Sequence, residues 1–123
     1  MSENPLARHG KVSYLEIPAT DLEQSAAFYE AIFGWTIERR ENGDRVFWDG
    51  AGDLLGRWIR SRPVSNHTGI LPYVYVSDIG AAMSEIDARG GSVAEAPRLE
   101  GDTLVGRFRD PAGNIVGIWQ FAS

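Results

Sequence analysis

Glu16 is the side chain in this sequence with the best opportunity for acid–base chemistry. It stands in the segment YLEIP at residues 14–18, whose alternation predicts a strand with Tyr14 and Glu16 on one face. A carboxylate beside tyrosines in a partly dry pocket would have a raised pKa, and it could act as a general base or acid or contact a ligand. The alternative is that Glu16 pairs with an arginine such as Arg107 or Arg109, or lies at a solvated edge.

Two stretches of nearly the same sequence form a second unusual pattern. They read DGAGDLLGRW from position 49 and DPAGNIVGIW from position 110, and five of their ten positions are identical. Each places a glycine inside a predicted strand, Gly56 and Gly117, and a tryptophan two residues later, Trp58 and Trp119. A glycine in a strand interior marks either a bulge or a close approach of another group to the backbone. We expect the two glycines to be equivalent to each other, and likewise the two tryptophans.

These stretches belong to a larger repeat that predicts the fold. The segment from position 21 matches the segment from position 78 at an offset of 57 residues, and the glycine-containing stretches match at an offset of 61. Each half therefore reads as a strand, a helix and three strands. This predicts an α+β fold of two tandem βαβββ modules, with curled mixed sheets around a cleft and helices on the outer face. The expected divisions are module one at about 11–60, a connector at 61–70 and module two at about 71–121, within a single domain over 1–123.

Local signals predict where the helices and strands begin and end. Thr20 and Glu23 have the spacing of a capping box, which predicts the start of the first helix, and Gly34 suits the position after its end. The second helix is expected at about residues 78–89. The remaining strands are expected at about residues 35–40, 45–49, 54–60, 92–95, 104–109 and 114–121.

Strand alternation predicts which side chains face the helices. Leu15 and Ile17 are the apolar set of the first strand, so they should pack on the first helix. The opposite faces then carry the aromatic side chains of Tyr14, Trp58, Tyr73, Tyr75 and Trp119. So much aromatic area with few polar groups predicts a cleft that binds a small molecule. The alternative is that these rings pack against one another across the two modules.

The composition excludes several classes of protein. The net charge of −5 argues against nucleic-acid binding, and no apolar run approaches the length of a membrane span. The absence of cysteine excludes disulfides and thiolate metal sites, and we expect a cytoplasmic location. Arginines gather in two places, Arg57, Arg60 and Arg62 and then Arg107 and Arg109. They predict either contacts to an anionic small molecule or a solvated strand face.

Three segments together carry a family resemblance. YLEIPATDLEQSAAFYEAIFGW, YVSDIGAAMSEIDARGG and RDPAGNIVGIWQ, in this order, resemble the vicinal oxygen chelate superfamily, which includes glyoxalases, extradiol dioxygenases, fosfomycin-resistance enzymes and bleomycin-binding proteins. The resemblance extends over about residues 12–120. It implies paired βαβββ modules, in agreement with the repeat, and it implies a homodimer.

The resemblance also implies four metal-binding positions in the cleft, usually occupied by His, Glu or Gln. Carried over to this chain, they fall at Tyr14, Gly56, Leu71 and Gly117. Two of these are glycines, one is leucine, and a tyrosine phenol is a poor ligand for Mg, Mn, Ni or Zn at neutral pH. The two histidines, His9 and His67, are expected in loops. We therefore expect no metal and no other cofactor.

The sequence leaves three interpretations of function open. The first is a metal-free member of the family that binds a small, largely apolar or aromatic molecule for sequestration, resistance or sensing. Its ligand would contact Tyr14, Glu16, Trp58, Tyr73, Tyr75 and Trp119. The second is a glyoxalase-like lyase or related enzyme, which would use Glu16 as base or a metal bound by other ligands. In a third interpretation, the aromatic face is a protein interaction surface.

Overall fold

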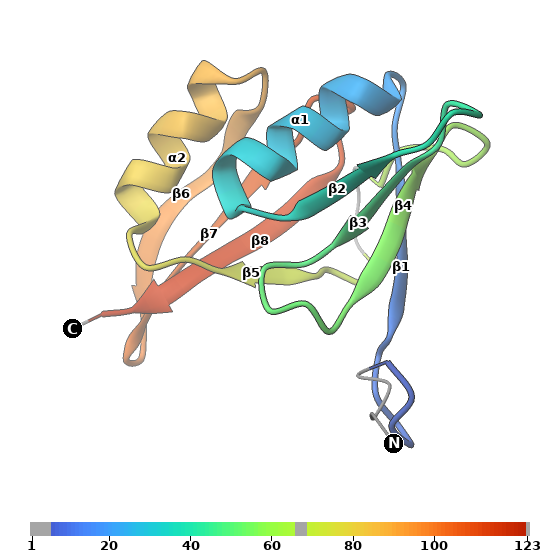
Figure 1. Cartoon of the computed structure of the whole chain (residues 1–123). Coiled ribbons are helices and arrows are strands. Elements are labelled where there is room, and N and C mark those ends of the chain that lie inside the picture. The colour runs from blue at the N-terminus through green and yellow to red at the C-terminus, as the bar shows by residue number, and fades with distance from the viewer. Residues whose placement is uncertain (1–5, 66–68, 123) are drawn as a thin grey trace. The chain divides into compact units, whose positions relative to one another are not determined.

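The first half of the chain forms a mixed sheet covered by one helix. In the computed structural model, which describes residues 6–65 and 69–122, its elements are β1 (Tyr14–Pro18), α1 (Leu22–Phe33), β2 (Thr36–Arg39), β3 (Arg45–Trp48) and β4 (Leu55–Ile59). The strand order is β1-β4-β3-β2, with β1 parallel to β4 and the other neighbours antiparallel (Figure 1). α1 packs on β2, β3 and β4.

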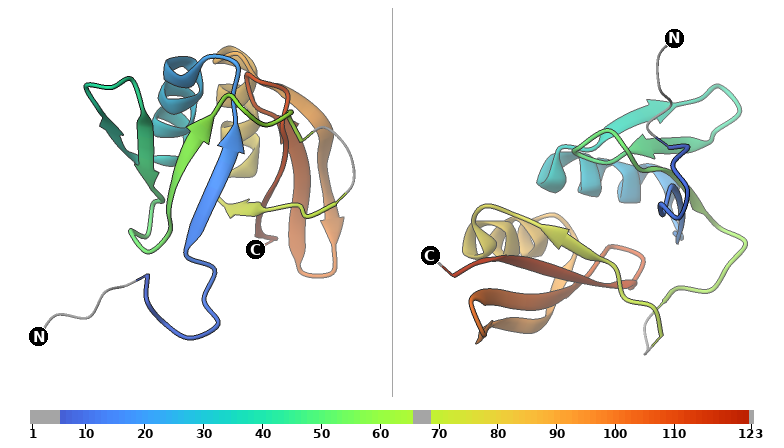
Figure 2. Two further views of the ribbon diagram at one scale, coloured as in Figure 1. Left: turned by 90° about the vertical axis from the view of Figure 1, so that its right-hand side faces the viewer. Right: turned by 90° about the horizontal axis from the view of Figure 1, so that it is seen from below.

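The second half repeats this arrangement. Its elements are β5 (Tyr73–Tyr75), α2 (Ile79–Ala88), β6 (Ser92–Glu100), β7 (Thr103–Arg109) and β8 (Ile115–Phe121). The strand order is β5-β8-β7-β6, again with one parallel pair, β5 and β8. α2 packs on β6, β7 and β8, and further views show each helix on one face of its own sheet (Figure 2).

The chain divides into two compact units, which we name unit 1 (Met1–Pro63) and unit 2 (Val64–Ser123). Each unit has the order β-α-β-β-β, so the predicted α+β fold of two βαβββ modules is confirmed. We call the face of each sheet that is turned away from the helix of the same unit its distal face. Among the described residues, no helix has the length and apolar character of a membrane span.

Both helices begin at an aspartate. The side chain of Asp21 accepts a hydrogen bond from the backbone N–H of Gln24 (3.0 Å), and Asp78 does the same for Ala81 (3.0 Å). The sequence predicted the N-cap at Thr20, which is one residue before the observed N-cap, Asp21. An aspartate caps a helix at least as well as a threonine, because its carboxylate also interacts favourably with the helix dipole.

The core of unit 1 is aromatic. Tyr29 of α1 stacks on Trp35 with ring centroids 4.7 Å apart, and Trp35 stacks on Phe47 of β3 at 4.6 Å. The core of unit 2 is aliphatic on the helix side, with Ile79, Met83 and Ile86 of α2 buried, and it includes Phe108 of β7.

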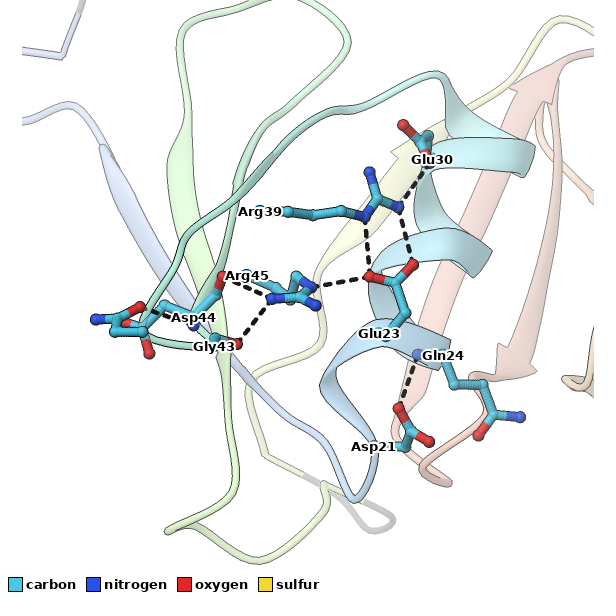
Figure 3. A network of polar contacts seen from close by, with 9 residues as sticks. Asp21, Glu23, Gln24, Glu30, Arg39, Gly43, Asp44 and Arg45 are labelled. Atoms are coloured by element: carbon cyan, nitrogen blue, oxygen red, sulfur yellow. Dashed lines mark hydrogen bonds and ion pairs between the residues drawn. The ribbon is translucent and has the colours of Figure 1, made fainter.

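Glu23 has a role different from capping, because it joins α1 to the edge of the sheet. It accepts hydrogen bonds from Arg39 (2.8 and 3.0 Å) and Arg45 (2.8 Å), as Figure 3 shows. Arg39 also donates to Glu30 (3.1 Å), and Arg45 donates to two loop carbonyl groups. Hydrogen bonds from Arg39 and then from Arg45 lower the pKa of Glu23 to about 2.

This cluster predicts a pH dependence of stability. A lowered pKa in the folded state means that the stabilisation is present above the unfolded value of 4.5 and is lost as the pH falls towards about 2. The side chains are partly exposed, so solvent screening limits the effect to about 1 kcal/mol. We expect Glu23→Gln to lower the free energy of unfolding by this amount at pH 6, in urea titrations, and the difference to shrink between pH 5 and pH 2. Glu85→Gln, which removes a carboxylate of α2 that pairs with Arg89 just after the helix, is the control. A difference of constant size over this range would contradict the assignment.

Candidate functional site: the distal faces of the two sheets

The distal face of unit 2 carries the aromatic side chains predicted for it. Tyr73 pairs with Gly117 and Tyr75 pairs with Trp119 across the parallel strands β5 and β8, so these four residues share a face. Ile118, which lies between Gly117 and Trp119 in the sequence, points to the helix side and is fully buried. The predicted orientation of Tyr73, Tyr75 and Trp119 is therefore the observed one.

Three rings on this face contact one another. The Trp119 ring lies edge-on to Tyr75, with centroids 5.1 Å apart, and edge-on to Phe121 at 5.0 Å. Tyr75 is 52% exposed and Phe121 is 54% exposed, so the rings form a surface cluster rather than a core. The sequence interpretation missed Phe121, although its position two residues after Trp119 places it on the same strand face.

Gly117 makes room for a tyrosine on the same face. A Cβ atom at Gly117 would overlap the ring of Tyr73, so the ring lies directly over the glycine backbone. This is the close approach that a glycine inside a strand permits. Beside it, Arg107 is the cross-strand neighbour of Gly117 and forms an ion pair with Glu95 (2.9 Å).

Trp58, by contrast, does not line the distal face of unit 1, so its predicted orientation was wrong. It is 2% exposed, and its ring centroid lies 4.8 Å from that of Phe47 and 5.7 Å from that of Tyr29 on α1. Trp58 is therefore part of the aromatic core. Its indole N–H is buried and has no hydrogen-bond partner among residues 6–65 and 69–122.

Gly56 also points to the helix side, so it is not the counterpart of Gly117. A Cβ atom there would overlap the carbonyl oxygen of Leu15 and the ring of Phe47, which is fully buried. Gly56 makes room for a core ring, whereas Gly117 makes room for a surface ring. The two glycines thus serve the same purpose on opposite faces of their sheets.

The reason for the difference is one extra residue in a loop. In unit 1 the backbone N–H of Asp49 bonds to the carbonyl oxygen of Leu54, five residues on, whereas Asp110 in unit 2 bonds to Asn114, four residues on. After the loop, the structural offset between the units is therefore 60 residues rather than 61. A shift of one residue moves every following side chain to the other face of the sheet.

The strand pairings identify the true equivalents. Ile17 pairs with Trp58 in unit 1 and Val74 pairs with Ile118 in unit 2, so Trp58 corresponds to Ile118. The same offset of 60 residues makes Arg57 the counterpart of Gly117. Arg57 therefore lies on the distal face of unit 1, where the sequence repeat had placed Gly56.

Glu16 lies on the distal face as predicted, but its surroundings are cationic. Its carboxylate forms ion pairs with Arg57 (3.1 Å) and Arg62 (2.9 Å), not with Arg107 or Arg109. Hydrogen bonds from Arg57 and then from Arg62 lower the pKa of Glu16. The expected raised pKa was therefore wrong, and a carboxylate with a lowered pKa is a weak general base.

The residues at the expected metal positions do not fit a divalent ion. Tyr14 lies at the start of β1 and is 49% exposed, and Leu71 precedes β5. With the corrected register, the remaining positions hold Arg57 and Gly117, a cation and a residue without a side chain. Within the described ranges, no three His, Cys, Asp or Glu residues are close enough together to hold a metal ion. His9 is exposed, and His67 lies outside the described residues.

The fold is similar to that of several solved structures. A glyoxalase/bleomycin resistance protein/dioxygenase family enzyme from Burkholderia phytofirmans PsJN is 18% identical, with a TM-score of 0.74 over 91% of this chain and 99% of that chain. TnmS3, an antibiotic binding protein from Streptomyces sp. CB03234, is 19% identical, with a TM-score of 0.69 over 94% of this chain and 98% of that chain. At these identities the similarity shows the fold alone.

Sequence comparison identifies the family. A glyoxylase-like domain-containing protein from Didymella fabae is 51% identical over 91 residues, which cover 68% of this chain and 70% of that protein. The model of the Glyoxalase/Bleomycin resistance protein/Dioxygenase superfamily matches residues 11–118. The match includes both βαβββ units, and it confirms the resemblance based on their helices and turns. The chain therefore belongs to the Glyoxalase/Bleomycin resistance protein/Dioxygenase superfamily.

Proposed function

We propose that this protein binds a small, largely apolar or aromatic molecule on the distal face of unit 2, without a divalent metal. The observation that carries the proposal is the cluster of Tyr75, Trp119 and Phe121, whose rings contact one another on a half-exposed sheet face. Exposed aromatic area of this kind favours a partner that covers it. Aromatic rings also stack on a flat ligand with low loss of conformational entropy.

Tyr73 extends this surface. Because its ring lies over Gly117, it adds a second flat area beside the cluster, and it is 45% exposed. Arg107 of β7 and its ion-pair partner Glu95 of β6 add charged groups beside this surface. An apolar surface with a few polar groups at its edge is the usual composition of a small-molecule site.

The chemistry of the donor set supports the metal-free part of the proposal. Tyr14, Arg57, Leu71 and Gly117 together offer one phenol and no carboxylate, imidazole or thiolate, whereas a metal site in a protein needs three or four such donors. TnmS3, an antibiotic binding protein with a similar fold, supports the binding of a small molecule, and a role in sequestration, resistance or sensing is part of the proposal. A homodimer, a cytoplasmic location and a single domain over residues 1–123 stay predictions.

The test uses the position of the tryptophans. Of the four tryptophans, only Trp119 lies in the aromatic cluster, whereas Trp48 lies on the distal face of unit 1. We expect an aromatic antibiotic from a screening panel to change the tryptophan fluorescence of the protein and of Trp48→Phe, but not of Trp119→Phe. Tyr75→Ala should weaken binding by about three- to tenfold, because it removes one ring contact.

Two results would contradict the proposal. One is the absence of any fluorescence change or thermal shift across a diverse aromatic panel. The other, which bears on the metal-free part alone, is a stoichiometric divalent ion in the purified protein by elemental analysis. Turnover of the methylglyoxal–glutathione adduct with added nickel or zinc would support the lyase alternative instead, and we expect none.

A further inference from the structure

Two arginines share one carboxylate on the distal face of unit 1. The Nε atom of Arg57 donates to one oxygen of Glu16 (3.1 Å), and an Nη atom of Arg62 lies 2.9 Å from the other oxygen. Arg57 and Glu16 are also direct cross-strand neighbours in β4 and β1. The carboxylate therefore holds both guanidinium groups on the same side of the sheet.

This group of three side chains has an excess of positive charge. Two guanidinium cations and one carboxylate leave a net charge of +1, on a protein whose total net charge is −5. Arg57 alone would be enough to neutralise the negative charge of Glu16. The second cation adds repulsion between the guanidinium groups, which costs on the order of 1 kcal/mol at the protein surface.

The Glu23 cluster in the same unit is a useful comparison. There too, two arginines share one carboxylate, but Glu30 supplies a second negative charge, so the charges balance. Arg45 also donates to two backbone carbonyl groups, so more of its N–H donors are used. In the Glu16 cluster, by contrast, no second carboxylate of the described residues forms an ion pair with either arginine, although Asp44 acts electrostatically on Arg57 from a distance.

Arg57 and Arg62 retain unused hydrogen-bond donors. A guanidinium group has five N–H donors, and each arginine contacts one oxygen of Glu16 and no other acceptor among residues 6–65 and 69–122. The side chains are 43% and 57% exposed, so a small molecule can reach them. Tyr14, two residues before Glu16 on the same face, supplies a phenol, and the pKa of Arg57 is raised by Glu16 and then by Tyr14.

We propose that Arg57 and Arg62, held by Glu16, bind the oxyanion group of a small molecule, either a carboxylate or a phosphate. Paired N–H donors of a guanidinium match the two oxygens of either group. Arg57 occupies the position equivalent to Gly117, where the family resemblance implied a metal ligand. Arg57 thus puts a cationic side chain where a metal-binding member would have a ligand residue. The residues lie in unit 1, so the proposal does not depend on the aromatic cluster of unit 2.

The experiment observes the arginines directly. Propionate and methyl phosphate are titrated separately into labelled protein at constant low ionic strength, and the Nε–H resonances of arginine are followed by NMR. Neither probe has an aromatic ring, so neither reports on the aromatic cluster. We expect saturable shifts at Arg57 and Arg62 with at least one of the two probes, and which of them binds identifies the source of the oxyanion. Propionamide, the neutral analogue of propionate, should cause no shift.

Matched variants separate a site from general attraction. Arg57→Gln and Arg62→Gln should each weaken binding by about threefold or more, because each removes a charged partner of the anion. Arg40→Gln removes an exposed arginine of the same unit whose side chain pairs, in the described part of the chain, with Glu38 alone, and it should leave the affinity unchanged. Arg40 and Arg62 are exposed and the Arg57 side chain is 43% exposed, so unchanged melting temperatures should accompany the results. Equal weakening by all three variants, binding of propionamide, or no saturable shift with either anion would overturn the proposal.

Discussion

Replacing Gly56 with alanine is expected to destabilise the protein by about 3 kcal/mol, at the upper end of what overpacking a core costs. The new Cβ atom would overlap the carbonyl oxygen of Leu15 and the ring of Phe47. Displacing either group would cost free energy, because the carbonyl belongs to the neighbouring strand and the ring is fully buried and stacked on Trp35. The melting temperature should fall by roughly 10 °C.

Gly117→Ala is the matched control, since the two glycines look equivalent in sequence. Its Cβ atom would meet the ring of Tyr73, which is half exposed and can rotate towards solvent. We expect a cost of about 1 kcal/mol or less, together with weaker ligand binding because the ring leaves its place. Thermal denaturation of both variants checks this, and equal destabilisation would show that the two glycines do face the same way.

Replacing Trp58 with alanine should have the largest effect on stability, a loss of about 4 kcal/mol. The indole is almost completely buried, and it contacts Tyr29 and Phe47. Its removal would leave a cavity between α1 and the sheet that rigid aromatic neighbours cannot fill. Trp58→Phe should cost much less, because it keeps an aromatic ring and removes a buried N–H that has no partner in the described part of the chain.

Trp119→Ala is the control for this second prediction. Its ring lies on the distal face beside Tyr75 and Phe121, so its removal should change the free energy of unfolding by about 1 kcal/mol. Ligand binding, not stability, should be lost. Chemical denaturation in urea measures all three tryptophan variants, and a Trp119→Ala cost equal to that of Trp58→Ala would contradict the assignment of the faces.

These results would mean that the two units share a fold but not a site. The distal face of unit 2 offers aromatic rings over a bare backbone, whereas the distal face of unit 1 offers Arg57 and Arg62 around Glu16. A repeat can keep the same backbone while its surface residues diverge, because exposed side chains on a distal face are less constrained by packing than core side chains.

Much of the fold could be predicted from the sequence by itself. Apolar spacing located both helices, and alternation located the strands to within a few residues, except β6, which runs to Glu100. The repeated order of elements was enough to predict two βαβββ units, and three segments, one of which contains the Asp110 turn, carried the resemblance to the family. In unit 2, alternation also predicted correctly that Tyr73, Tyr75 and Trp119 lie opposite the helix. These features depend on local chemistry, which short stretches of sequence contain.

The tertiary structure decided what the repeat alone could not. Five identities between two ten-residue stretches favoured an alignment in which Trp58 matches Trp119, whereas one extra loop residue shifts the strand by one position. Because side chains alternate across a strand, that shift placed Trp58 and Gly56 in the core and Arg57 on the surface. It also gave Glu16 two arginine partners from its own unit, and so a lowered pKa in place of a raised one. Composition and spacing determine which strands form, but the register of neighbouring strands, set by loop length and core packing, determines which face each side chain occupies.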